Sequence, residues 1–155
     1  MTHGGVRVQG TVLALAQRPS KGGSMLVSDS LNLTPNEGVV GDHGKSKRRQ
    51  VTILDVSLWE AACVEAGTSL PWTTRRANIL VQDIDLQNLV GKKIRIGTAS
   101  AEVLGEVDPC HVMDAAHLGL KAAMKSEWRG GVYARILKEG RVKIEDKITL
   151  NQSSQ

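Results

Sequence analysis

Residues 93–107 read Lys93-Ile-Arg-Ile96-Gly97-Thr98-Ala99-Ser-Ala-Glu-Val-Leu-Gly-Glu-Val107. Aliphatic and β-branched residues recur on both sides of Gly97-Thr98, and that dipeptide has the composition of a turn. The stretch therefore predicts two short strands, residues 93–96 and 99–107, joined by Gly97-Thr98.

The rest of the chain repeats this pattern of short apolar runs separated by turns. Strands are predicted at residues 6–16, 50–54, 78–81, 132–137, 141–144 and 147–150, with short apolar pieces at 25–27 and 31–33. Glu139-Gly140 predicts a tight hairpin turn. Many short strands with few helices favour a mostly-β, barrel-like fold with two or three short helices.

The predicted helices are few and short. Asp55 is a candidate N-cap, Gly67 a candidate C-terminal stop, and apolar residues recur between them at helical spacing. Cys63 lies on that apolar face and is interpreted as part of the core. Residues 85–90 predict one helical turn. Residues 114–125 have helical composition, with Leu118, Ala122 and Met124 as the candidate inward residues.

Length and composition predict one domain in the cytoplasm. The chain has 155 residues, which suits a single domain over residues 1–150 with a disordered tail at 151–155. It has no Phe, one Tyr and three Trp, so the core must be aliphatic. No apolar run approaches the length of a membrane span, and no signal peptide is visible.

The formal net charge of +4 predicts an anionic partner. Single-stranded nucleic acid is disfavoured, because its binders stack bases on aromatic side chains that are scarce here. The only cysteines, Cys63 and Cys110, lie 47 positions apart, so no zinc site or iron–sulfur cluster is expected. No flavin site is expected either.

Cys110 is the candidate reactive residue. Pro109 precedes it and ends the strand, so Cys110 falls where a strand passes into a loop. A thiol acts as nucleophile, sulfur carrier or soft-metal ligand only as its thiolate. The alternative interpretation is a small buried apolar residue.

Three further segments carry polar or basic side chains next to glycines or strands. Two of them could bind an anion through guanidinium, ammonium or amide groups, or could be solvated surface: Asp42-His43 between two glycines with Lys45, Lys47, Arg48 and Arg49 after them, and Arg75-Arg76 with Asn78. The third, Tyr133 with Arg135 after Gly130-Gly131, places both side chains on one face of a strand, or follows an ordinary turn.

Taken in order, these segments resemble the MOSC family, the C-terminal domain of molybdenum cofactor sulfurase. The resemblance runs from about residue 6 to 150 and is carried by Gly38-Val-Val-Gly-Asp-His-Gly44, Arg49-Gln-Val-Thr-Ile-Leu-Asp55, Arg75-Arg-Ala-Asn-Ile79, Gly91 through Ile96-Gly97, Pro109-Cys110 and Gly130-Gly-Val-Tyr-Ala-Arg135. The chain departs from the family at Ala77, where an acidic residue is frequent, at His43, where Arg is frequent, and at Glu145-Asp146.

The resemblance implies a β-barrel-like fold that binds molybdenum cofactor (molybdopterin) or carries sulfur. Cys110 matches the family's cysteine, which holds a persulfide in sulfur carriers and ligates molybdenum in reductases of N-hydroxylated compounds. The implied cofactor-binding residues are Arg75, Arg76, Asn78, Asp42, His43, Arg49, Tyr133 and Arg135.

Three functions follow as hypotheses, and they leave open whether the chain is an enzyme. The first is a cofactor-binding sulfur carrier or sulfur transferase, whose partner is a pyridoxal-phosphate-dependent cysteine desulfurase or a molybdoenzyme. The second is a molybdenum-dependent reductase with Cys110 as the metal ligand, which would need a redox partner. The third is a non-catalytic module that binds an acidic partner through its basic loop.

Overall fold

The computed structural model describes residues 2–3, 6–20, 23–43, 48–108 and 111–151. Most of its regular elements are strands, as the sequence predicts. They are β1 (Thr2–His3), β2 (Val6–Arg7), β3 (Gln9–Gln17), β4 (Leu26–Ser28), β5 (Ser30–Thr34), β6 (Gly38–Val39), β7 (Val51–Asp55), β8 (Ile79–Gln82), β9 (Lys93–Ile96), β10 (Ala99–Glu106), β11 (Val132–Lys138), β12 (Gly140–Lys143) and β13 (Lys147–Leu150).

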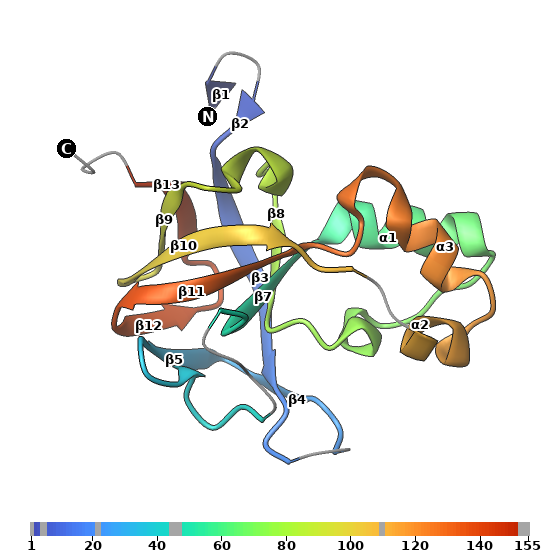
Figure 1. The fold of residues 1–155 in the computed structure, drawn as a ribbon, viewed down its shortest axis with the longest axis horizontal. Coiled ribbons are helices and arrows are strands. Elements are labelled where there is room, and N and C mark those ends of the chain that lie inside the picture. The colour runs from blue at the N-terminus through green and yellow to red at the C-terminus, as the bar shows by residue number, and fades with distance from the viewer. Residues whose placement is uncertain (1, 4–5, 21–22, 44–47, 109–110, 152–155) are drawn as a thin grey trace.

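Seven of the described strands close a barrel, in the order β13-β9-β10-β11-β7-β8-β3, with β13 pairing back onto β3 (Figure 1). All neighbours in the barrel are antiparallel except β7 and β8, which are parallel. β4 pairs with the last residues of β3, and β5 pairs with β6 and β12 in a separate small sheet. The predicted mostly-β barrel fold is confirmed.

The barrel interior is aliphatic. Alternate residues along each strand point inward, so on β11 Val132 and Ala134 are buried, whereas Tyr133 is half-buried and Arg135 exposed. The largest fully buried side chains of this core include Leu15, Leu33, Ile53, Ile79, Ile84, Leu89, Ile94 and Ile96. Branched aliphatic residues therefore fill the space that aromatic residues fill in many other barrels.

Helices gather to one side of the barrel (Figure 1). They are α1 (Val56–Ala66), α2 (His111–Ala116) and α3 (Leu120–Lys125), and shorter 3₁₀ turns are η1 (Trp72–Arg75), η2 (Leu86–Leu89) and η3 (Ser126–Trp128). α1 and α3 enclose a second apolar cluster around Trp59, Cys63, Leu120 and Met124. None of the helices in the described part of the chain is long and apolar enough to span a membrane.

Several local predictions are confirmed. Asp55 caps α1, since its side chain accepts hydrogen bonds from the N–H groups of Ser57 and Leu58. Gly67 ends that helix in the left-handed conformation, at φ 78°. Cys63 is buried, and β9 and β10 pair on either side of Gly97-Thr98.

The predicted hairpin at Glu139-Gly140 is wrong. β12 begins at Gly140 and pairs with β5, and no pairing of β12 with β11 occurs among the described residues. A Cβ built on Gly140 would lie 2.4 Å from the backbone nitrogen of Ala99. The glycine is needed because a side chain there would overlap with the backbone of Ala99. A glycine required by a close backbone contact cannot be told from a glycine of a turn by sequence alone.

The predicted helical segment 114–125 is two helices, and two of its three inward residues are wrong. Gly119, at φ 94°, separates α2 from α3. The Asp114 carboxylate accepts hydrogen bonds from the N–H groups of Gly119 and Lys121 and so holds the break. Because of this break, the side chains of 114–125 do not follow a single helical repeat. Leu118 and Ala122 are exposed, and of the three predicted inward residues only Met124 is buried.

Candidate functional site

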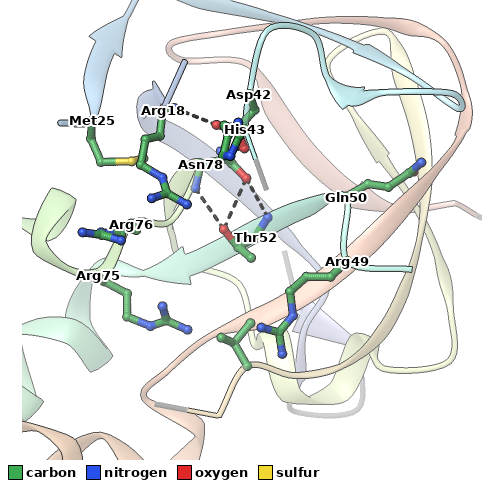
Figure 2. A pocket seen from close by; sticks show the side chains of 11 residues that line it. Arg18, Met25, Asp42, His43, Arg49, Gln50, Thr52, Arg75, Arg76 and Asn78 are labelled. Carbon is green, nitrogen blue, oxygen red and sulfur yellow. Dashed lines mark hydrogen bonds between the residues drawn. The ribbon is translucent and has the colours of Figure 1, made fainter. Parts of the chain in front are cut away.

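A polar pocket of about 170 Å³ opens beside the first residues of β7 and β8 (Figure 2). Segments far apart in the sequence meet there: the end of β3, the residue before β4, the loop after β6, the start of β7, the end of η1 and the end of β10. The lining residues are Arg18, Met25, Asp42, His43, Arg49, Gln50, Thr52, Arg75, Arg76, Asn78 and Val107.

Asn78 and Asp42 form the hydrogen-bonded base of the pocket. Asn78 is 4% exposed, and its Oδ1 accepts from the Thr52 N–H at 3.0 Å. Its Nδ2 donates to the Ala16 carbonyl at 3.2 Å and to Asp42 Oδ2 at 3.3 Å. Asp42 Oδ1 accepts from the backbone N–H of Arg18 at 2.6 Å. Both side chains are therefore fixed before any ligand arrives.

The charge of the pocket is strongly positive. Arg18, Arg49, Arg75 and Arg76 line it, and Asp42 is the one carboxylate among its described lining residues. Arg76 adopts the left-handed conformation, at φ 63°, where η1 ends. That conformation costs a non-glycine residue about 1–2 kcal/mol, and such strain clusters at functional sites.

Gln50 joins the wall of the pocket to the rest of the fold. Its side chain is buried; Nε2 donates to the Pro35 carbonyl and Oε1 accepts from the Ile136 N–H, both at 2.7 Å. These bonds occupy both ends of the amide, so we assign Gln50 a structural role.

Six of the eight residues that the sequence singled out for cofactor binding line this one pocket: Arg75, Arg76, Asn78, Asp42, His43 and Arg49. Tyr133 and Arg135 do not. The Arg135 guanidinium lies on the outer face of β11 and forms an ion pair with Glu102, Nη2 to Oε1 at 2.9 Å. Tyr133 instead contacts Arg49, whose Cζ lies 5.1 Å from the centroid of the tyrosine ring.

Sequence reasoning did not single out five of the lining residues as site residues: Arg18, Met25, Gln50, Thr52 and Val107, although Gln50 and Thr52 lie in the stretch 49–55 that carries the family resemblance. Arg18 stands in a stretch of turn residues, Arg-Pro-Ser-Lys-Gly-Gly, and glycine-rich turns that carry an arginine are one signal that could have marked it. The others belong to strands or their ends, where only the folded barrel reveals which side chains reach the pocket.

Cys110, Pro109, Lys45 and Lys47 lie outside the described residues. In the sequence, Cys110 follows the lining residue Val107 by three positions. Among the described residues, no group of three or more His, Cys, Asp and Glu side chains is placed to hold a metal ion.

The end of β10, just before Cys110, is acidic. Partial burial, and then the nearby charge of Asp108, raises the pKa of the Glu106 carboxyl above its ordinary value of 4.5. Val107 lines the arginine-lined pocket and is therefore flanked in the sequence by two acidic residues, Glu106 and Asp108.

Comparison with known proteins places these features in a family. The model of the MOSC domain matches residues 40–149. The YuaD protein of Bacillus subtilis has a similar structure, with a TM-score of 0.75 at 20% identity, over 90% of this chain and 94% of that one. YiiM of Escherichia coli gives a TM-score of 0.70 at 16% identity, over 92% of this chain and 70% of that one.

YiiM of Geobacillus stearothermophilus gives a TM-score of 0.65 at 13% identity, over 91% of this chain and 73% of that one. At these identities the solved structures establish a shared fold. No curated protein matches the chain. The family match covers most of the sequence, including every segment that lines the pocket except Arg18 and Met25, and the chain belongs to the MOSC domain family.

Proposed function

We propose that this MOSC domain binds molybdenum cofactor by its anionic end in the arginine-lined pocket and that Cys110 carries sulfur as a persulfide. The observation that carries the proposal is the convergence of four arginines from three separate segments on one pocket with a single described carboxylate. A cationic site of this kind suits a phosphate-bearing ligand, because guanidinium groups bind phosphate oxygens in pairs of hydrogen bonds.

The pocket residues fit the anionic end of the cofactor in kind. Arg18, Arg49, Arg75 and Arg76 would hold its phosphate, and Asp42, which Asn78 Nδ2 and the Arg18 N–H hold in place, would face its polar ring edge. Sites that enclose an organic ligand usually measure about 300–1,000 Å³, so a pocket of about 170 Å³ would hold one end of the cofactor. When bound, the cofactor supplies a molybdenum centre able to accept sulfur or electrons.

Cys110 would receive sulfur by thiol–disulfide-type exchange. Its thiolate attacks the terminal sulfur of a persulfide on a cysteine desulfurase, the S–S bond of that persulfide breaks, and the desulfurase cysteine leaves as its thiolate. Cys110 then holds the persulfide, and no net electron transfer occurs. The place of Cys110 in the sequence supports this role, since it follows Val107, a residue that lines the pocket, by three positions. We expect this exchange in the cytoplasm, where thiols stay reduced.

Mass spectrometry tests the sulfur-carrier role. The protein is incubated with a pyridoxal-phosphate-dependent cysteine desulfurase and cysteine, and we expect the wild type to gain the mass of one sulfur atom, removable by a reductant. Cys110→Ser should gain none. Cys63→Ser is the matched control and should gain sulfur normally, because Cys63 is a buried core residue. Equal gain in Cys110→Ser and the wild type would reject the role.

Metal and pterin analysis tests the cofactor-binding role. The protein is purified from a host that makes molybdenum cofactor, and we expect pterin to copurify with the wild type and to be lost from Arg75→Gln/Arg76→Gln. Absence of pterin from the wild type would reject the proposal. Molybdenum that is lost from Cys110→Ser while pterin is retained would instead favour metal ligation by Cys110, as in the reductase hypothesis.

A further inference from the structure

The ring of Tyr133 lies over a glycine of the neighbouring strand. Tyr133 on β11 pairs with Gly105 on β10, next to a register shift between Val103 and Gly105. A Cβ built on Gly105 would lie 3.1 Å from Tyr133 Oη and 3.2 Å from Cε1. These contacts are tighter than about nine in ten contacts of real Cβ atoms, so a side chain at Gly105 would press on the ring and the glycine leaves room for it.

The same ring contacts an arginine of the pocket. Tyr133 also pairs with Thr52 of β7, which lines the pocket, and Arg49 stands just before that strand. The Arg49 Cζ lies 5.1 Å from the ring centroid, within the range of a cation–π contact. The phenol is therefore not itself part of the pocket lining, and its ring contacts Arg49, which is.

A fixed Arg49 side chain would favour ligand binding. Arg49 is exposed, and an arginine side chain loses up to about 2 kcal/mol of conformational free energy when it is fixed in one geometry. A ring that holds the guanidinium in place before the ligand binds removes part of this cost from binding.

We propose that Tyr133 is a positioning residue, which holds the Arg49 guanidinium at the wall of the anion pocket by a cation–π contact and depends on Gly105 for the place of its ring. The inference rests on the proposed function of the pocket. The aromatic ring carries the effect and the hydroxyl does not, so phenylalanine should replace tyrosine and leucine should not.

A ligand-free measurement tests the contact itself. The ring current of Tyr133 should shift the Arg49 side-chain resonances upfield in NMR spectra of the unliganded protein. We expect Tyr133→Phe to keep the shift, and Tyr133→Leu and Gly105→Ala to lose it. Arg49 resonances that are the same in the wild type and Tyr133→Leu would overturn the proposal, whether or not the pocket binds cofactor.

Calorimetric titration with pyrophosphate tests the consequence for binding. We expect Tyr133→Leu to weaken binding about two- to fivefold and Tyr133→Phe to bind as the wild type does. In an Arg49→Gln background, Tyr133→Leu should have no further effect, which separates positioning through Arg49 from general loss of structure. An equal loss in both backgrounds, or the same loss in Tyr133→Phe, would overturn the proposal.

The two proposals fail in different ways. If Arg75→Gln/Arg76→Gln binds pyrophosphate as well as the wild type does, the proposed function of the pocket is wrong. If that variant binds weakly but Tyr133→Leu binds normally, only the positioning role is wrong.

Discussion

Asn78 is the residue on which the geometry of the pocket most depends. Its amide accepts from the Thr52 N–H of β7 and donates to the Ala16 carbonyl of β3 and to Asp42. A primary amide can donate and accept at once, which a carboxylate or an aliphatic side chain cannot do. One buried asparagine thus links two strands to the loop that carries Asp42.

We expect Asn78→Ala to destabilise the fold by about 1–3 kcal/mol, because the Thr52 N–H and the buried Ala16 carbonyl would lose their partner. Urea unfolding followed by circular dichroism measures the change. Asn32→Ala is the control: Asn32 is an exposed asparagine of β5, and its loss should cost less than about 0.5 kcal/mol. Similar midpoints for the two variants would contradict the structural role of Asn78.

At the scale of elements, the site is built where strands begin and end. β7 and β8 are parallel, so their first residues lie at the same end of the barrel and bring Thr52 and Asn78 together. The far end of β7 is Asp55, whose carboxylate caps α1. The connection through α1 and η1 returns the chain to the pocket, and Arg75 and Arg76 end that connection.

Gly131, just before β11, lets the backbone of β11 come close to that of β7. Gly131 has φ 88°, and a Cβ built on it would lie 2.3 Å from the Ile53 carbonyl oxygen. Gly91 has nearly the same conformation, φ 85°, but nothing lies within 4 Å of its Cβ position. Comparing alanine substitutions at Gly91 and Gly131 therefore separates the free-energy cost of the left-handed conformation from the cost of the close contact with Ile53.

We expect Gly91→Ala to cost about 1–2 kcal/mol of unfolding free energy, the cost of a left-handed alanine. Gly131→Ala should cost about 3–4 kcal/mol, because overlap with Ile53 adds to that cost. Urea unfolding of both variants measures the difference. Equal costs would mean that β7 yields freely to the added methyl group and that the approach is not needed.

The sequence predicts the elements better than it predicts their partners. Residues 93–96 and 99–106 pair as expected, because Gly97-Thr98 fixes their connection locally. The hairpin predicted at Glu139-Gly140 is wrong because Gly140 lies close to the Thr98–Ala99 backbone, a contact that forms only in the closed barrel. The single helix predicted at residues 114–125 is wrong because helical composition does not reveal the break that Gly119 and Asp114 make.

At the scale of the whole molecule, an ion pair ties the N-terminal strand to the body. The Asp85 carboxylate accepts from the backbone N–H of Arg7 at 2.7 Å and from its guanidinium at 2.9 Å. Partial burial works to raise the pKa of Asp85, but the hydrogen bonds and charge of Arg7 outweigh it, so the pKa lies below its ordinary value of 3.8. Folding therefore favours the ionised carboxylate.

We expect Asp85→Asn to lower the stability at pH 7 by about 0.5–1 kcal/mol, since the pair is partly exposed. Because the pKa of Asp85 is lowered by folding, its contribution to the free energy of unfolding is present above about pH 3.8 and is lost as the pH falls through the pKa of the folded state. The difference in unfolding free energy between the wild type and Asp85→Asn should therefore shrink in acid. Asp83→Asn is the control, because the Asp83 side chain is 69% exposed and its Oδ1 lies 3.7 Å from Arg7 Nη1. An equal loss of stability in Asp83→Asn, or a loss in Asp85→Asn that does not change with pH, would contradict this account.

The site could be anticipated only in part, for a reason that belongs to the whole fold. Arg75, Arg76 and Asn78 stand together in the sequence, and Asp42 and His43 stand between glycines, so both groups carry a local signal. Arg18 carries only the weaker signal of an arginine in a glycine-containing turn, and it joins them because β3 ends beside the Asp42 loop. Alternation on β11 marked Tyr133 and Arg135 as sharing a face, but only the folded strands place one near Arg49 and the other beside Glu102.

The central claim is that the convergence of arginines makes this pocket an anion site, and molybdopterin binding tests it most directly. Equilibrium titration compares the wild type with Arg75→Gln/Arg76→Gln and with Arg95→Gln/Arg141→Gln, which removes the same charge from residues outside the pocket lining. We predict that the pocket variant loses at least about tenfold in affinity, as expected for charge-assisted hydrogen bonds worth about 1.5–3 kcal/mol each, and that the control stays within about twofold of the wild type. Equal affinity of the two variants would contradict the claim.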